Sequence, residues 1–143
     1  MRIIIDADGC PVIRIAAACA AEHNVLCVLV CDTAHIFSTE GVEVITVSQG
    51  SDSADFKIVN LISDGDIVVT QDYGLAAMCL AKTKKVLNQN GLIFSESNID
   101  GLLNSRHINK QIRMHGGHTK GPLKRKQQQD EDFLKSLLNL IES

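Results

Sequence analysis

Residues 2–12 read RIIIDADGCPV, and this stretch decides the fold because it joins a buried strand to a helix. The consecutive isoleucines Ile3, Ile4 and Ile5 are typical of a strand that is covered on both faces, as in a parallel sheet. Pro11 suits the first turn of a helix, where a missing N–H breaks no helical hydrogen bond. Between the two elements lie two carboxylates, Asp6 and Asp8, where the strand ends.

The alternation of strand and helix patterns continues as far as residue 88. Expected strands lie at residues 2–6, 25–31, 43–47, 66–72 and 84–88, with expected helices between them at residues 11–24, 51–63 and 73–82. Such alternation predicts an α/β fold, a three-layer α/β/α sandwich with a mainly parallel central sheet. Right-handed crossovers restrict the topology, and the common strand order is 3-2-1-4-5.

The rest of the chain is predicted to add a short strand, a loop and two helices. We expect the strand at residues 92–94, a helix at 95–116 capped by Ser97, and a polar loop at 117–129. Residues 130–143 then form an amphipathic helix whose apolar stripe packs on the domain. The stripe consists of Phe133, Leu137, Leu140 and Ile141.

Composition indicates one domain over residues 1–143, because 45% of the residues are apolar and can form a core of that size. No apolar run approaches a membrane span, and the N-terminus lacks a leader pattern because Asp6 and Asp8 interrupt it. The five cysteines form no Cys-x-x-Cys pair, so we interpret them as reduced, mostly buried thiols of a cytoplasmic protein. Aromatic residues make up only 3%, which argues against base stacking.

Five aspartates are predicted to gather at the carboxyl edge of the sheet, where parallel strands end and crossover helices begin. Asp6 and Asp8 follow the first strand, and Asp72 ends the fourth. Asp52 and Asp55 open the helix between the third and fourth strands. With the order 3-2-1-4-5 the first and fourth strands are neighbours, so Asp6 and Asp72 face each other across the crevice where ligands bind in such folds. Asp55 continues the buried face of its helix into that crevice.

Carboxylates gathered in one crevice repel each other unless some are protonated or a cation is present. Mg²⁺ and Mn²⁺ prefer oxygen ligands, and such an ion can activate water and stabilise the leaving oxygen of a phosphodiester. The predicted catalytic and metal-binding residues are Asp6, Asp8, Asp55 and Asp72, with Asp52 as a second-tier metal ligand. The alternative is local structure, because Asp52 and Asp72 can cap helices and Asp8 before Gly9 can belong to a turn.

The stretch DADGCPV also resembles the DxDGT motif of haloacid-dehalogenase-type phosphatases, with Asp6 as nucleophile and Asp8 as general acid. That class has a later Gly-Asp pair after a strand, whereas Asp66 precedes an apolar run here and should lie on the opposite edge of the sheet. Cys10 also stands where the motif has Thr. The phosphatase is therefore a less favoured alternative.

Residues 106–126 contain seven Lys and Arg residues and no acidic one, although the whole chain has a net charge of −3. Such a basic segment suggests a polyanionic partner, and a solvated tail is the alternative. The predicted nucleic-acid-binding residues are Arg106, Lys110, Arg113, His118 and Lys120. The first three share one side of a helix, and the last two lie in a Gly-rich loop with free backbone N–H groups. His115 and His118 could instead ligate a metal.

The stretches DADGCPV, SADFKIVNLISDGDIVVTQDYGLAA and RHINKQIRMHGGHTKGP resemble the bacterial YaiI/YqxD family of PIN-like proteins. This resemblance implies a PIN-like α/β/α domain. PIN domains are typically metal-dependent ribonucleases with acidic residues at the carboxyl edge, and Asp6, Asp55 and Asp72 match the common acidic positions. Asp8 is their close companion.

We therefore expect a cytoplasmic nuclease that uses Mg²⁺ or Mn²⁺ and acts on RNA more readily than on DNA. The alternative from another class is a nucleic-acid-binding protein that keeps one structural cation and has no catalytic activity. We expect no membrane partner, and a homodimer remains open.

Overall fold

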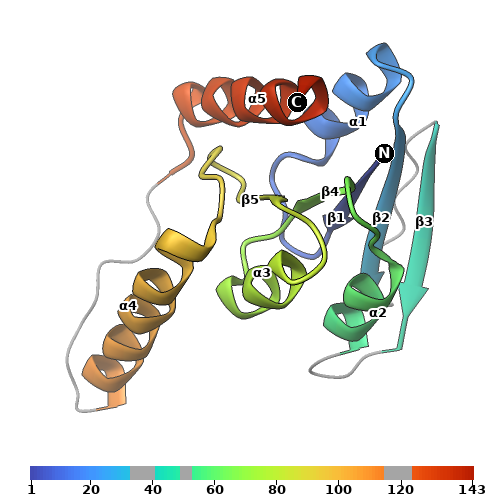
Figure 1. The fold of residues 1–143 in the computed structure, drawn as a ribbon. Helices are drawn as coiled ribbons and strands as arrows, with labels where there is room; N and C mark the ends of the chain where they lie inside the picture. Colours follow the sequence, from blue (N-terminus) through green and yellow to red (C-terminus); the bar gives the residue numbers. More distant parts are fainter. Residues whose placement is uncertain (33–40, 49–52, 115–123) are drawn as a thin grey trace.

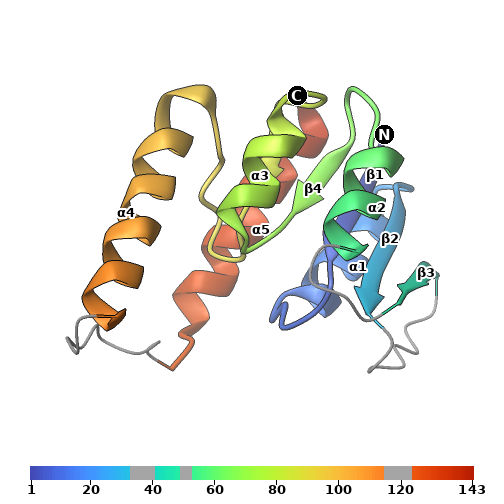
Figure 2. The same ribbon diagram turned by 90° about the horizontal axis from the view of Figure 1, so that it is seen from below.

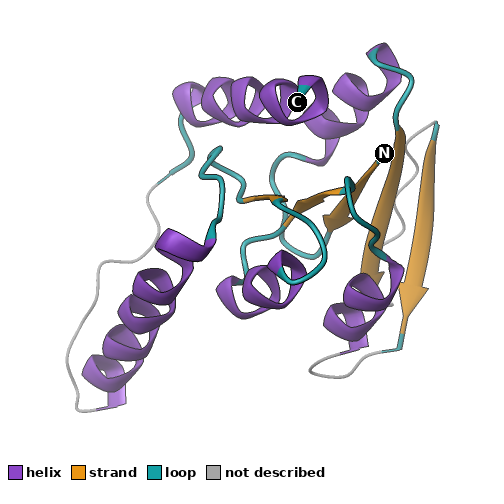
Figure 3. Ribbon diagram, viewed as in Figure 1, coloured by secondary structure: helices purple, strands orange, loops and turns teal. Residues whose placement is uncertain are grey.

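The computed structural model describes residues 1–32, 41–48, 53–114 and 124–143, and of residues 106–114 it describes the helical backbone alone. Its described residues form a parallel sheet in the order β3-β2-β1-β4-β5, which confirms the expected order (Figure 1; Figure 3, orange). The strands are β1 Arg2–Asp6, β2 Leu26–Asp32, β3 Val42–Val47, β4 Ile67–Val69 and β5 Lys85–Leu87.

Helices cover both faces of this sheet, so the predicted three-layer α/β/α sandwich is confirmed. Helices α1 and α5 pack on one face, and α2 and α3 pack on the other (Figure 1). Helix α4 lies outside α3 and packs against it (Figure 2). The helices are α1 Ile13–Glu22, α2 Ser53–Leu61, α3 Tyr73–Leu80, α4 Glu96–Met114 and α5 Gln127–Glu142.

Side chains of β1 alternate between the two cores, and this alternation orients the residue that follows them. Ile3 and Ile5 belong to the core under α1 and α5, together with Phe133 of α5. Ile4 belongs to the core under α2 and α3. Asp6 comes two residues after Ile4, so its carboxylate lies on the side of the sheet that α2 and α3 cover.

Three details of the C-terminal half differ from the sequence-based expectation. Helix α5 begins at Gln127 and not at residue 130, because the side chain of Gln129 accepts a hydrogen bond from the Lys126 N–H and closes an earlier turn. Ser97 is not the cap of α4, because the helix begins at Glu96. Residues 92–94 contribute only an isolated antiparallel bridge to Leu87.

The cysteines behave as expected for structural thiols. Four of the five are buried, Cys10 is half-buried, and all are free thiols. Burial raises the pKa of Cys27 to about 11 and that of Cys79 to about 12. Within the ranges that the structure describes, none of the helices has the length and apolar character required to span a membrane.

Candidate functional site

Asp6 ends β1 and turns toward the neighbouring strand β4. Its Oδ2 accepts a hydrogen bond of 3.0 Å from the hydroxyl of Thr70, a side chain that follows β4 and is buried. The same hydroxyl oxygen accepts a 3.0 Å hydrogen bond from the backbone N–H of Asp72. The ends of β1 and β4 are therefore linked through Thr70, and Asp6 and Asp72 lie at the same edge of the sheet. Asp72 does not end the fourth strand as predicted, because β4 ends at Val69 and Asp72 caps the helix that follows.

Asp72 is the N-cap of α3. Its Oδ1 accepts hydrogen bonds from the backbone N–H of Gly74 at 2.8 Å and of Leu75 at 3.2 Å. The alternative interpretation of Asp72 as a helix cap is therefore confirmed. Capping uses backbone donors and leaves the residue negatively charged, so Asp72 still contributes its charge to the carboxyl edge.

Asp8 turns the other way, toward the end of β2. Its Oδ2 accepts a 2.9 Å hydrogen bond from the backbone N–H of Asp32. Its Oδ1 is buried and accepts no hydrogen bond from any residue that the structure describes. Next to it, Gly9 has a φ of +72°, and its carbonyl accepts a 2.9 Å hydrogen bond from Gln71. The loop after β1 is thus held between the ends of β2 and β4.

Asp55 lies in the first turn of α2 and is half-buried. Its charge acts on Asp6, as do the charges of Asp8 and Asp72, and we call these four residues the acidic cluster. The pKa of Asp6 is raised to about 6, and desolvation by burial is the largest cause. The hydrogen bond from Thr70 has the opposite effect and lowers the pKa. The three neighbouring carboxylates raise it further.

The acidic cluster is not a preformed metal cage. Among the described residues no group of three or more His, Cys, Asp or Glu side chains is placed so that it could hold a metal ion. The expectation that Asp6, Asp55 and Asp72 bind one cation therefore stays a prediction, because their side chains do not form such a group in the structure. The physical reason is that local partners orient them: Asp6 faces Thr70, and Asp72 accepts hydrogen bonds from the start of its own helix. Asp52 lies outside the described residues.

The predicted nucleic-acid contacts fall largely outside what the structure describes. Arg106, Lys110 and Arg113 belong to the part of α4 described as backbone alone, and His118 and Lys120 lie outside the described residues, as does His115. Helix α4 ends and α5 begins on the side toward which the β2 arrow points in Figure 2, which is the carboxyl edge. The end of α4 and the start of α5 are therefore on the same side as the acidic cluster.

Sequence reasoning assigned no role to two residues at this edge, Thr70 and Arg125. The Nε of Arg125 donates to Asp130 Oδ1 at 2.7 Å, its Nη1 to Asn90 Oδ1 at 2.7 Å, and its Nη2 to the Gln89 carbonyl at 2.6 Å. Gln89 and Asn90 follow β5, so Arg125 is attached to the carboxyl edge. The only local signal for Arg125 was the Asp five residues later, because the partners after β5 are distant in sequence.

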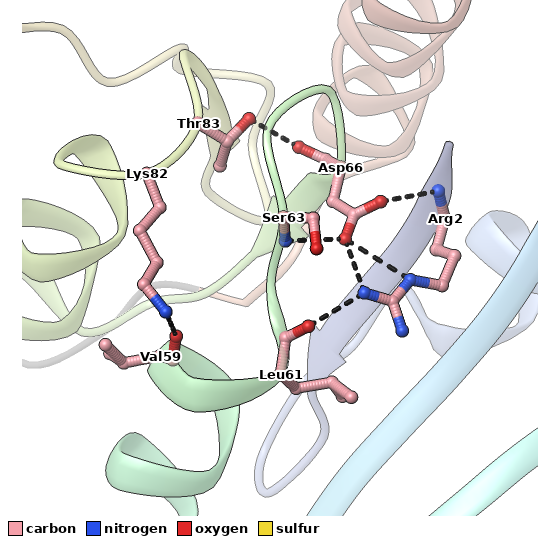
Figure 4. Close-up of polar contacts among 7 residues, drawn as sticks. All are labelled: Arg2, Val59, Leu61, Ser63, Asp66, Lys82 and Thr83. Atoms are coloured by element: carbon pink, nitrogen blue, oxygen red, sulfur yellow. Dashed lines mark hydrogen bonds and ion pairs between the residues drawn. The ribbon is translucent and has the colours of Figure 1, made fainter.

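At the opposite, amino edge of the sheet, Asp66 has different surroundings from those of Asp6 (Figure 4). Its carboxylate forms a 2.8 Å ion pair with Arg2 and also accepts hydrogen bonds from the backbone N–H groups of Arg2 and Ser63. The Asp66 carbonyl accepts a 2.7 Å hydrogen bond from Thr83. Asp66 therefore lies at the opposite edge from Asp6, where the argument against the phosphatase motif places it.

A pocket of about 430 Å³ lies away from the acidic cluster, at the end of α3 and the start of α4. Its lining mixes apolar, hydroxyl and charged side chains of both signs. The lining residues are Leu80, Lys84, Phe94, Ser95, Glu96 and Ser97.

Comparison with known proteins identifies relatives over the whole chain. Residues 4–143 match the family described as "Uncharacterized BCR, YaiI/YqxD family". The chain is 50% identical over 141 residues to a UPF0178 protein of Exiguobacterium sibiricum, covering 99% of this chain and 96% of that protein. It is 51% identical over 142 residues to a UPF0178 protein of Natranaerobius thermophilus, with 99% and 96% covered. No solved structure matches the chain.

Proposed function

The chain belongs to the YaiI/YqxD family. From this membership and the chemistry of the acidic cluster, we propose that the protein is a divalent-metal-dependent nuclease that cleaves RNA. The observation that carries the proposal is Asp6. Its carboxylate ends a buried strand at the topological switch point, it is desolvated, and three other aspartates act on it. A fold that only needed a strand end would not require this concentration of negative charge.

The donor set fits Mg²⁺ or Mn²⁺ in its chemistry. Both ions prefer carboxylate oxygens, and Mg²⁺ needs only one or two carboxylates, with water and substrate phosphate as its other ligands. The buried Oδ1 of Asp8, which accepts no hydrogen bond from a described residue, is a carboxylate oxygen that a cation would satisfy. In this proposal Asp6 and Asp8 would hold the ion, and Asp55 and Asp72 would supply further ligands or negative charge.

A bound divalent cation supplies Lewis-acid chemistry at a phosphodiester. The protein's own residues do the rest of the proposed work. Thr70 fixes the orientation of the Asp6 carboxylate through its 3.0 Å hydrogen bond. Asp8 is oriented by the Asp32 N–H, so that its second oxygen remains for the ion. With a pKa of about 6, Asp6 is ionised at neutral pH and takes up a proton in mildly acidic solution, where cation binding should weaken.

The test is Asp6→Asn, which removes one charge and keeps the size of the side chain. We expect the wild type to cleave a single-stranded RNA in Mn²⁺, and we expect Asp6→Asn to lose this activity while remaining folded. The matched control is Asp64→Asn, an exposed aspartate in the turn before β4, which should cleave like the wild type. The same assay with single-stranded DNA tests the preference for RNA.

Each outcome assigns the protein to one class. Equal cleavage by the wild type and Asp6→Asn in a nuclease-free preparation would reject the proposal. RNA binding without any metal-dependent cleavage would instead indicate the non-catalytic binding protein. Trapping of Asp6 by beryllium fluoride would indicate a phosphatase with Asp6 as its nucleophile.

A further inference from the structure

The sequence KRK at residues 124–126 contains three cations that look equivalent, but the structure separates them. Arg125 is 23% exposed, and all three nitrogens of its guanidinium donate hydrogen bonds. Lys124 and Lys126 are exposed, and neither forms an ion pair with a residue that the structure describes. The middle residue is therefore an anchor, and its two neighbours point their charges to solvent.

The anchor is rigid because the turn that receives it is itself locked onto α5. Asn88 is buried, and its Oδ1 accepts 2.9 Å hydrogen bonds from the backbone N–H groups of Asn90 and Leu92. Gly91 has a φ of +86°, and a Cβ at this position would lie 2.5 Å from the Asp132 carbonyl. Ser136 of α5 donates a 2.7 Å hydrogen bond to the Gly91 carbonyl. Helix α5 thus packs directly on the backbone of the turn after β5.

The anchor lies at the same edge of the sheet as the acidic cluster. The turn at residues 88–91 follows β5 and so belongs to the carboxyl edge. The start of α5 lies on this edge in Figure 2.

Among the described residues, none of the acidic side chains at the start of α5 forms an ion pair with Lys124 or Lys126. Asp130 pairs with Arg125 at 2.7 Å. Glu131 and Asp132 accept hydrogen bonds from Gln127 and Gln128 of the preceding turn. Lys124 and Lys126 are therefore exposed cations that no described carboxylate pairs with.

We propose that Arg125 holds Lys124 and Lys126 at the carboxyl edge, where they contact the phosphate backbone of a single-stranded RNA bound at the acidic cluster. This inference rests on the proposed function and adds the residues that bind its substrate. A cluster of carboxylates repels phosphate, so a strand that reaches it needs fixed cations nearby. Two lysines on either side of a rigid arginine anchor supply them, and Arg125 acts as a positioning residue.

The experiment measures binding of a single-stranded RNA to the full chain in Ca²⁺ over a range of salt concentrations. The double variant Lys124→Ala/Lys126→Ala should bind more weakly, and its slope of log K against log salt should be flatter by about 1.4, at about 0.7 for each phosphate contact. The matched control is Lys84→Ala/Lys135→Ala, which removes two exposed charges elsewhere. It should retain the wild-type slope. Equal slopes for the two double variants would overturn the inference.

Two further variants test the positioning role of Arg125. Arg125→Lys keeps the charge, but the single nitrogen of an ammonium group cannot reach the three acceptors that the three guanidinium nitrogens contact. If Arg125 positions its neighbours, Arg125→Lys should bind RNA as weakly as Arg125→Ala at a temperature where circular dichroism shows both to be folded. If Arg125→Lys binds like the wild type, only charge matters and the positioning role is rejected.

Failure of this inference is distinguishable from failure of the proposed function. Wild-type cleavage in Mn²⁺ with no effect of the lysine pair on binding would retain the nuclease and reject these contacts. A lysine-dependent salt slope without cleavage would retain the contacts and reject the nuclease. Absence of RNA binding by the wild type would reject the contacts directly.

Discussion

Aspartates at the two edges of the sheet have pKa shifts in opposite directions. Asp66 at the amino edge is buried, and Asp6 at the carboxyl edge is half-buried. For Asp66, desolvation would raise the pKa, but hydrogen bonds from Arg2 and the Ser63 N–H, together with the Arg2 charge, lower it overall. For Asp6, desolvation dominates, one hydroxyl opposes it, and three carboxylates add to it.

The comparison shows how structural and candidate functional carboxylates differ. Asp66 has a cation and backbone donors, so its charge is compensated within the protein. The charge of Asp6 is compensated by a single hydroxyl group among the hydrogen bonds that the structure describes. A half-buried carboxylate whose charge no cation of the described residues compensates is a candidate for binding a ligand that does.

The largest effect is expected from removing the cation that pairs with Asp66 at the amino edge. Arg2→Ala should lower the free energy of unfolding by about 3 kcal/mol at pH 7, because it leaves the buried Asp66 carboxylate without its cation. A carboxylate with a lowered pKa contributes stability above its unfolded pKa and loses it as pH falls through the folded value. The effect of Arg2→Ala should therefore shrink in acid. Urea unfolding measures it, and Arg14→Ala, an exposed arginine, should change stability by less than about 0.5 kcal/mol.

The second prediction concerns Asp6 and has the opposite dependence on pH. Because its pKa rises from 3.8 to about 6 on folding, the folded protein binds more protons between these values, and its stability falls as pH rises through them. In metal-free buffer Asp6→Asn should raise the free energy of unfolding by about 2 kcal/mol at pH 8, after allowance for partial exposure. The gain should vanish near pH 4. A difference between the two proteins that is the same at every pH would contradict the environment described for Asp6.

A divalent cation should reverse the order of stability of the wild type and Asp6→Asn. Saturating Mn²⁺ binds the folded state, so it should raise the melting temperature of the wild type. Asp6→Asn should respond less, because one carboxylate ligand is missing. Differential scanning fluorimetry with and without Mn²⁺ measures the two shifts. Equal shifts would mean that the cation binds elsewhere on the protein.

The smallest expected effect sharpens the comparison by removing the hydroxyl group. Thr70→Val keeps the shape of a buried side chain and should cost about 1 kcal/mol of stability. The pKa of Asp6 should rise above its wild-type value, because the hydrogen bond that lowers it is lost. Carboxyl carbon NMR during a pH titration measures this directly. Thr46→Val, at an exposed position of β3, should leave that pKa where it is.

The sequence alone predicted the five strands of the sheet and the edges at which Asp6, Asp66 and Asp72 lie. Apolar runs such as residues 2–6 and 25–31 are local signals, and parallel crossovers then leave few strand orders. Asp6 follows a strand and Asp66 precedes one, so their opposite edges could be derived without coordinates. The role of Asp72 as the cap of α3 could also be predicted from the sequence, because the donors that it accepts from are two and three residues away.

Only the tertiary structure decided what each of these side chains contacts. Asp6 turns to Thr70, 64 residues away, and Asp8 turns to the Asp32 N–H, 24 residues away, so they do not form a single cage. Arg125 reaches the turn after β5 across 35 residues. Local periodicity reports which face or edge a residue occupies. The direction of its polar atoms depends on donors brought near by packing, and these are set by the assembled sheet and not by neighbours in the chain.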